Sequence, residues 1–369
     1  METQTMMKLT NVNMKSDSLP VDLVMEILKR LPVKTLIRFL SVSKLWASTI
    51  RSRDFMKLFL NVSLTRPKGL LFLFRHGYCG LALYPKTHEP SSFTTFHVSF
   101  HSSQWSTVSP SVHGLICYAQ ATTLVIYNPC TRRSIALPEI DTWRRPIRYY
   151  LGHDPMENDY KVLCAMLGGT RDLVKEFRVL TLGTESSWKM IENNLISHAP
   201  FGRELCINGV LYYQGTDART YDLTIVSFNV RSEKIYPIKG PSGSSVFMHF
   251  ESSKLISYEE KLAVLFFAKD VRLCVLEDAA KEEWSMKTFV LSTAISALNG
   301  YGNSRSTVTD TGEIITAPRF LHASVVNLDY YDMKTSSERT VYILGNKTED
   351  TVYYVESLSS NLVENLMFL

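Results

Sequence analysis

A strand–turn–strand pattern that recurs about every fifty residues constrains the fold of this chain more than any other feature. Each unit has a strand that ends in an aromatic residue or leucine, a polar turn that often contains serine or threonine, and a second strand. The units begin at Tyr84, Tyr127, Leu182, Phe228, Leu276 and Tyr331, at spacings of 43 to 55 residues. This spacing is typical of kelch-type propeller blades, each a small four-stranded sheet. The pattern therefore predicts an all-β domain, a β-propeller of about six blades. A large β-sandwich would explain the strands but not the period.

Two further features indicate how the blades would join. We expect "VYYVESL" near the C-terminus to pair with "KGLLFLF" near Lys68 and close the ring, because closure removes two exposed sheet edges. Trp188 and Trp284 occupy equivalent places in their repeats, at the start of the outgoing strand. We expect both indole rings to pack between neighbouring sheets rather than to stack on a ligand.

The residues before the repeats follow a helical pattern. Pro20 suits the first turn of a helix, and Pro32 ends it. One apolar stripe of this helix is predicted to comprise Leu23, Ile27, Leu28 and Leu31. Two short helices and a last one capped by Asp54 are predicted to follow. Helices this short need packing partners. Periodicity alone leaves open whether the module docks on the β body or shares its apolar surface with another protein.

Composition and charge narrow the class of protein. Of the 369 residues, 45% are hydrophobic and 21% charged, as in soluble globular proteins, and the formal net charge is only +4. This balance does not indicate a nucleic-acid surface. The N-terminal residues lack the apolar core of a signal peptide, and no apolar run approaches the length of a membrane span. We therefore expect neither nucleic acid nor a membrane as partner, and a location in the cytoplasm, the nucleus or both.

The sequence carries no motif of a familiar enzyme. It has no phosphate-binding Walker loop, no G-x-S-x-G and no G-x-G-x-x-G. The densest titratable cluster is His153, Asp154, Glu157 and Asp159. A metal site there is conceivable, but no second histidine-rich segment completes it, which favours a role in forming a turn. We expect no catalytic residue, no metal and no cofactor.

One loop has the composition of a binding site. The segment "DTWRRPIRYY" brings together Trp143, Arg144, Arg145 and Arg148, and Trp, Tyr and Arg dominate binding hot spots. These four residues are our candidates for binding a protein target. The alternative is an inter-strand loop whose tryptophan packs into the barrel wall.

The helical segment "LPVDLVMEILKRLPVKTLIRFLSVSKLW" closely resembles the F-box, its plant version in particular, without gaps. The resemblance implies that the helices lie in a groove of the Skp-type adaptor of a cullin–RING ubiquitin ligase. The adaptor-binding residues that it implies are Leu19, Pro20, Leu23, Ile27, Leu31, Pro32, Val42 and Trp46. Some of them, Trp46 above all, could instead belong to the core of the module.

The β-rich part resembles the F-box-associated domain of plant F-box proteins, with interruptions from about residue 68 to about residue 290. The motif residues are Gly114, Leu115, Asn128, Pro129, Thr131, Gly152, Asp154, Pro155, Asp159, Tyr160, Lys161, Val162, Asn208 and Gly209. We interpret them first as turn-formers, because Asn, Pro and Asp fix the turns of blades. The resemblance implies a domain that recruits a substrate.

These observations predict three parts: a disordered tail at residues 1–16, a small all-α three-helix F-box module at 17–60, and a propeller-like substrate-binding domain at 61–369. The predicted function is the non-catalytic substrate-recognition subunit of an SCF-type cullin–RING ubiquitin ligase. Its partners would be the Skp-type adaptor, through it the cullin and RING subunits, and a protein target that the sequence does not identify. The alternatives are a protein-binding scaffold that does not lead to degradation, and an enzyme with titratable side chains converging on the propeller channel.

Overall fold

The structure is a computed structural model that describes residues 19–74, 79–86, 89–99, 108–120, 123–140, 146–169, 171–184, 187–192, 197–241, 253–267, 271–289, 304–322, 325–344 and 352–367. The predicted tail at residues 1–16 lies outside these ranges, and so do Trp143, Arg144 and Arg145.

Four helices form the N-terminal module. They are α1 (Val21–Leu28), α2 (Val33–Phe39), α3 (Lys44–Ile50) and α4 (Arg53–Leu64). Pro20 and Pro32 directly precede α1 and α2, as the sequence predicts. The predicted cap of α4 at Asp54 is wrong: the hydroxyl of Ser52 accepts a hydrogen bond from the Phe55 N–H at 3.2 Å, and Asp54 lies inside the first turn. Within the described ranges, no helix is long and apolar enough to cross a membrane.

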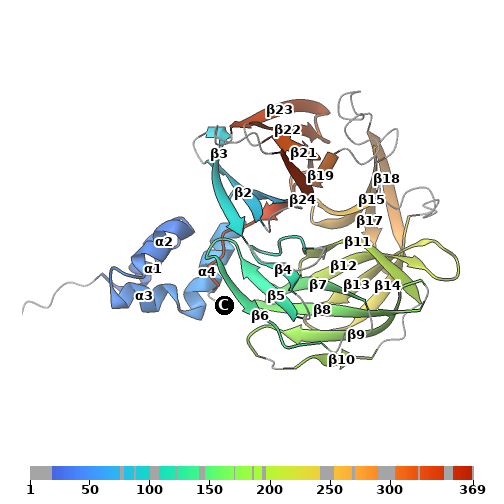
Figure 1. The fold of residues 1–369 in the computed structure, drawn as a ribbon, viewed down its shortest axis with the longest axis horizontal. Coiled ribbons are helices and arrows are strands. Elements are labelled where there is room, and N and C mark those ends of the chain that lie inside the picture. The colour runs from blue at the N-terminus through green and yellow to red at the C-terminus, as the bar shows by residue number, and fades with distance from the viewer. Residues whose placement is uncertain are drawn as a thin grey trace, which may run out of the picture.

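The strands that follow the helices form a six-bladed β-propeller (Figure 1). The first blade contains β24 (Val352–Leu362), β1 (Gly69–Phe74), β2 (Cys79–Lys86) and β3 (Glu89–Ser99). The second contains β4 (Ile116–Gln120), β5 (Thr123–Asn128) and β6 (Arg133–Ala136). The third contains β7 (Ile147–Asp154), β8 (Asp159–Gly168), β9 (Leu173–Thr181) and β10 (Lys189–Ile191).

The last three blades follow in chain order. The fourth contains β11 (His198–Ile207), β12 (Val210–Asp217), β13 (Leu223–Asn229) and β14 (Ile235–Lys239). The fifth contains β15 (Ser253–Tyr258), β16 (Lys261–Phe267), β17 (Val271–Asp278) and β18 (Glu283–Phe289). The sixth contains β19 (Ser304–Val308), β20 (Glu313–Pro318), β22 (Val325–Asp332) and β23 (Ser337–Leu344), and a short extra strand, β21 (Phe320–His322), pairs with both β22 and β24. The predicted propeller of about six blades is confirmed, and the β-sandwich is excluded.

The C-terminal strand closes the ring. β24 pairs antiparallel with β1, with Leu71 opposite Ser359 and Phe72 opposite Leu358. This confirms the predicted pairing of the two distant segments. Because one blade is built from both ends of the propeller domain, the ring has no free edge at its seam.

The two equivalent tryptophans bridge neighbouring blades. The Trp188 ring nitrogen donates to the Pro138 carbonyl at 2.8 Å, and the Trp284 ring nitrogen donates to the Lys239 carbonyl at 3.0 Å. Each acceptor belongs to the outer part of the preceding blade. Both rings also pack against apolar cores, so the prediction of packing between sheets is confirmed.

Six inner strands surround the propeller axis: β24, β4, β7, β11, β15 and β19. They run in the same direction, since early residues contact early residues, as Arg305 contacts Val355, and late ones contact late ones, as Cys206 contacts His153. Their C-terminal ends lie toward the helices, where β24 leads into the chain end beside α4 (Figure 1). We call this side of the propeller the helix face and the opposite side, where the inner strands begin, the far face.

Candidate functional site

The helical module has a filled core of its own. Its buried side chains are Val24, Leu28, Val33, Leu36, Ile50, Phe55, Phe59 and, from the other end of the chain, Leu366. The prediction of one apolar stripe on the first helix is therefore wrong at Leu28, because this side chain points into the core with Val24 while Leu23 and Ile27 point outward. Helix α1 is apolar on two sides.

An apolar surface is left over on the outside of the module. Leu19, Leu23, Ile27 and Val42 are 56%, 51%, 52% and 65% exposed. Val21 and Leu45 are exposed as well. Neither was predicted from the sequence, because apolar residues at helical spacing are normally assigned to a core. We call these six residues the outward apolar surface. Isolated exposed apolar residues are ordinary, but six of them on one small module indicate an interaction site.

The other predicted adaptor-binding residues lie around and beneath this surface. Pro20 and Pro32 are exposed. Leu31 and Trp46 are half-buried and pack against the module core. The Trp46 ring meets the Phe39 ring edge-on, with 4.8 Å between their centroids. Trp46 therefore packs against the core of the module while part of its side chain stays exposed, and its contact with an adaptor stays a prediction.

The C-terminal segment, residues 363–367, joins the module to the propeller. Leu366 is completely buried in the helical core. Glu364 accepts hydrogen bonds from the Val33 N–H at 3.2 Å and from the Arg66 guanidinium at 3.1 Å. Burial raises the pKa of the Glu364 carboxyl despite these two donors. The segment is thus an integral part of the module, although it is about 300 residues away in sequence.

The propeller holds the same segment from the other side. The Asn365 amide donates to the His113 carbonyl at 2.8 Å and to the Tyr160 hydroxyl at 3.0 Å. The Asn128 amide donates to the carbonyls of Asn365 and Met367, at 3.2 and 3.1 Å. Asn128 and Tyr160 are among the motif residues that we interpreted from the sequence as turn-formers. Asn128 does form a turn, since its side-chain oxygen accepts from the Cys130 N–H, but its second role in clamping the chain end was missed.

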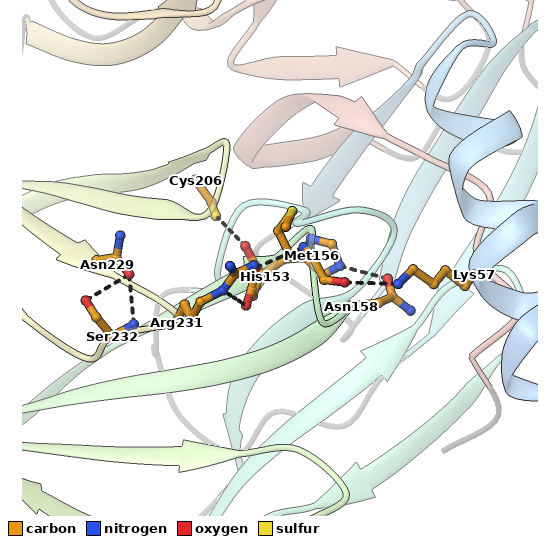
Figure 2. A network of polar contacts seen from close by, with 9 residues as sticks. Lys57, His153, Met156, Asn158, Cys206, Asn229, Arg231 and Ser232 are labelled. Atoms are coloured by element: carbon orange, nitrogen blue, oxygen red, sulfur yellow. Dashed lines mark hydrogen bonds and ion pairs between the residues drawn. The ribbon is translucent and has the colours of Figure 1, made fainter.

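A second contact between the two parts involves the turn between β7 and β8 (Figure 2). The Lys57 ammonium on α4 donates to the Met156 carbonyl at 2.9 Å, and Arg53 pairs with Asp159 at 3.1 Å. Asp154 anchors the turn, because its carboxylate accepts two hydrogen bonds of 2.9 Å from Arg231. The Arg231 hydrogen bonds also lower the pKa of Asp154. Helix α4 therefore rests on a turn that the neighbouring blade fixes.

The titratable cluster is part of this junction. The His153 ring bonds to the Asn158 side chain at 3.0 Å and packs edge-on against His113, with ring centroids 4.3 Å apart. Burial lowers the pKa of His153. In the network of Figure 2, the His153 ring bonds to Asn158 in the turn, and the Asp154 carboxylate accepts from the Met156 N–H. Both side chains thus stabilise the turn. Over the described parts of the chain, no group of three or more His, Cys, Asp or Glu side chains is placed to hold a metal ion.

Of the four candidates for target binding, the structure places one. Arg148 is the second residue of β7, lies opposite Ala165 and is half-buried. It therefore lies toward the far face, away from the helices. The other three fall outside the described residues, so their role stays a prediction.

Comparison with known proteins gives the same two-part division. Residues 16–58 match the F-box domain, and residues 69–365 match the F-box associated beta propeller domain. At4g38870 of Arabidopsis thaliana, named as an F-box protein, is 47% identical over 398 aligned positions that cover 100% of this chain and 92% of that protein. The Arabidopsis thaliana F-box protein At2g21930 is 41% identical over 382 aligned positions, which cover 96% of this chain and 95% of that protein.

Proposed function

Because the chain belongs to the F-box proteins that carry an F-box associated β-propeller domain, we propose that it is the substrate-recognition subunit of an SCF-type cullin–RING ubiquitin ligase. The helical module binds a Skp-type adaptor, which connects the chain to the cullin and RING subunits. The propeller recruits a protein target. The chain itself catalyses no step and works in the cytoplasm, the nucleus or both.

The outward apolar surface carries this proposal. The module fills its own core with other side chains, and Leu19, Leu23, Ile27 and Val42 lie outside that core and are each more than half exposed. Apolar anchors on one helix face are the usual means by which a helix binds in the groove of a partner. Burying a leucine or isoleucine side chain contributes roughly 1.5–3 kcal/mol, so a few such anchors suffice for stable binding.

The rigid junction supports the second half of the proposal. A target held on the propeller has a defined position relative to the adaptor only if the two parts of the chain do not swing. The C-terminal segment and the turn below α4 provide contacts at two places. A ligase subunit that acts by proximity gains from such fixation, because a held target meets the ubiquitin-charged enzyme as if the reaction were intramolecular.

Adaptor binding depends on Leu23 and Ile27 if the proposal is right. In a co-purification of the full chain with a Skp-type adaptor, the double variant Leu23→Asp, Ile27→Asp should weaken binding by at least a hundredfold, because each change places a carboxylate in an apolar contact worth about 2 kcal/mol. Met190→Asp, Met286→Asp is the matched control, since both methionines are 64% exposed and lie on outer strands of the propeller. Equal loss in both variants, or unchanged binding of the first, would contradict the proposed contact.

Ligase function and scaffolding differ in the fate of the targets. Proximity labelling with the helical module deleted should capture proteins whose abundance falls when the full chain is expressed. Inhibition of the cullin or the proteasome should restore them. Partners whose abundance does not respond to either treatment would favour a scaffold that does not lead to degradation.

A further inference from the structure

The turn between α2 and α3 carries an exposed serine. Residues 40–43 connect the two helices, and Ser41 and Val42 are both exposed in this connection. The Ser41 hydroxyl donates to the Arg38 carbonyl in the last turn of α2, at 2.8 Å. Ser41 therefore presents its hydroxyl to solvent outside any helix.

The segment around Ser41 is basic and contains no acidic residue. Between Glu26 and Asp54 the chain has no Asp or Glu, but it has Lys29, Arg30, Lys34, Arg38, Lys44, Arg51 and Arg53. Arg38 lies three residues before Ser41 and Lys44 three residues after it, and both side chains are exposed. Within the part of the chain that the structure describes, neither of these two cations forms an ion pair. Positive charge thus flanks the hydroxyl on both sides.

Position distinguishes Ser41 from other serines of the helical module. Ser43 and Ser52 cap α3 and α4, where their hydroxyls accept hydrogen bonds from backbone N–H groups. Ser48 is exposed, but it lies inside α3. Ser41 combines exposure, a place in a turn and basic neighbours on both sides.

We propose that Ser41 is a phosphorylation site and that its phosphate prevents the outward apolar surface from binding the adaptor. The phosphoryl donor is ATP on a serine/threonine protein kinase. The Ser41 Oγ attacks the γ-phosphorus, the bond from this phosphorus to the β,γ-bridging oxygen breaks, ADP leaves, and the hydroxyl proton passes to the catalytic base of the kinase. This switch rests on the proposed function, because it regulates the surface that carries that function.

The charges beside Ser41 define the class of kinase. A substrate groove lined with carboxylates pairs with Arg38 and Lys44 through charge-assisted hydrogen bonds. Presenting the serine in an extended segment requires the last turn of α2 to open. This helix has only seven residues, and the ends of short helices open at a lower free energy than the core does.

The free module tolerates a phosphate at this position. A phosphoserine carries a charge of about −1.5 to −2 near pH 7. It loses the O–H that donates to the Arg38 carbonyl, and it places negative charge at the C-terminal end of α2, which is unfavourable. The nearby cations Lys34, Arg38 and Lys44 offset this cost, and Ser41 lies outside the buried core of the module. We therefore expect the helices to stay folded.

The complex with the adaptor does not tolerate the phosphate. Val42 directly follows Ser41 and is 65% exposed, and Leu45, four residues after Ser41, is 43% exposed. A groove that covers these two side chains removes water from the neighbouring Ser41. A phosphate would lose its hydration there, and burying a charge without full compensation is costly. Phosphorylation thus favours the free chain, and a bound adaptor in turn shields Ser41 from the kinase.

The first experiment measures phosphorylation of the full chain without adaptor. The chain is incubated with ATP and the catalytic domain of a kinase that requires arginine three residues before the serine, and mass spectrometry locates the phosphate. We expect phosphate on Ser41, a rate at least tenfold lower for Arg38→Gln, and recovery of most of this rate in Arg38→Lys. Ser48→Ala is the matched control and should change the rate at Ser41 less than twofold. Phosphate only at other residues, or equal loss in the control, would overturn the site.

The second experiment measures adaptor affinity. The phosphorylated chain should bind a Skp-type adaptor at least tenfold more weakly than the unphosphorylated chain, and phosphatase treatment should restore the affinity. Ser41→Ala should bind the adaptor normally with or without kinase treatment. Far-UV circular dichroism of the two forms should coincide, since a loss of helical signal would mean that the phosphate unfolds the module instead of blocking its surface.

The reciprocal effect provides an independent check. Saturating adaptor should slow phosphorylation of Ser41 at least tenfold, while a free peptide substrate in the same reaction keeps its rate. Full adaptor affinity of the phosphorylated chain would overturn the switch and leave the proposed function intact. Absence of adaptor binding by the unphosphorylated chain would instead refute the proposed function, whatever the first experiment shows for Ser41.

Discussion

Gly114 illustrates how much a single backbone position contributes to this molecule. It adopts a φ of +87°, which side-chain-bearing residues rarely adopt, and a Cβ there would lie 2.4 Å from the Val363 carbonyl oxygen. The glycine therefore lets the C-terminal segment pass directly against the second blade. The sequence marks Gly114 as a motif residue, but the segment that requires it lies at the other end of the chain.

We expect Gly114→Ala to lower the free energy of unfolding by about 2–4 kcal/mol, since backbone strain and a clash with main-chain atoms add. Urea unfolding followed by tryptophan fluorescence would measure the loss. Gly183→Ala is the matched control, because Gly183 has a similar φ of +81° but nothing within 4 Å of its hypothetical Cβ. The control should lose only about 1 kcal/mol. Similar losses in both variants would show that the close approach of the chain end does not matter.

Glu204 makes stability depend on pH. Burial raises the pKa of its carboxyl from 4.5 to about 7 in the folded protein. Between these values the folded state binds more protons than the unfolded state, so the contribution of Glu204 to stability falls as pH rises and is lost above about 7. Each pKa unit corresponds to about 1.4 kcal/mol. Glu204→Gln does not titrate, so its stability relative to the parent protein should rise by about 3 kcal/mol from pH 4.5 to pH 8. A difference that stays constant across this range in urea unfolding would refute the assigned pKa.

At the scale of elements, structural features that repeat along the chain can be predicted from the sequence, whereas features that occur only once cannot. The blades, the closing pair β1–β24 and the two inter-blade tryptophans follow from patterns that local physics repeats along the chain. The direction in which α1 presents its two apolar sides does not follow, because periodicity cannot tell an inward leucine from an outward one. Leu28 and Leu23 differ only in what packs beside them.

The C-terminal segment shows the same limit more strongly. Leu366 completes the core of helices that lie at the opposite end of the sequence, and no pattern around it indicates a helical partner. Likewise, Arg203, Lys254 and Arg305 lie on three strands, about 50 residues apart, and their charges act on one another only once the inner strands surround the axis. Contacts between distant segments depend on topology, which single-sequence patterns do not contain.

At the scale of the whole molecule, β24 joins the sixth blade, the first blade and the helical module. It pairs with β21 near its start, closes the ring against β1, and leads into the segment that fills the helical core. The outward apolar surface and the propeller therefore belong to one connected body. A change in how the segment docks should alter their relative position without altering the structure of either.

Leu366→Ser should uncouple the helices from the propeller while both remain folded. Removing this buried side chain costs about 2–5 kcal/mol in the helical core, and we expect amide hydrogen exchange in α1–α4 to accelerate by at least tenfold while β8 and β12 stay protected. Leu328→Ala, which opens a cavity in the core of the sixth blade, should instead accelerate exchange in β20 and β22 while α1–α4 stay protected. In the reconstituted ligase, Leu366→Ser should retain adaptor binding in proportion to the fraction of folded helices. Its rate of ubiquitin transfer to a captured target should nevertheless be several-fold lower than that of the parent protein. Uniform acceleration of exchange over the whole chain would show instead that the module and the propeller unfold as a single cooperative unit.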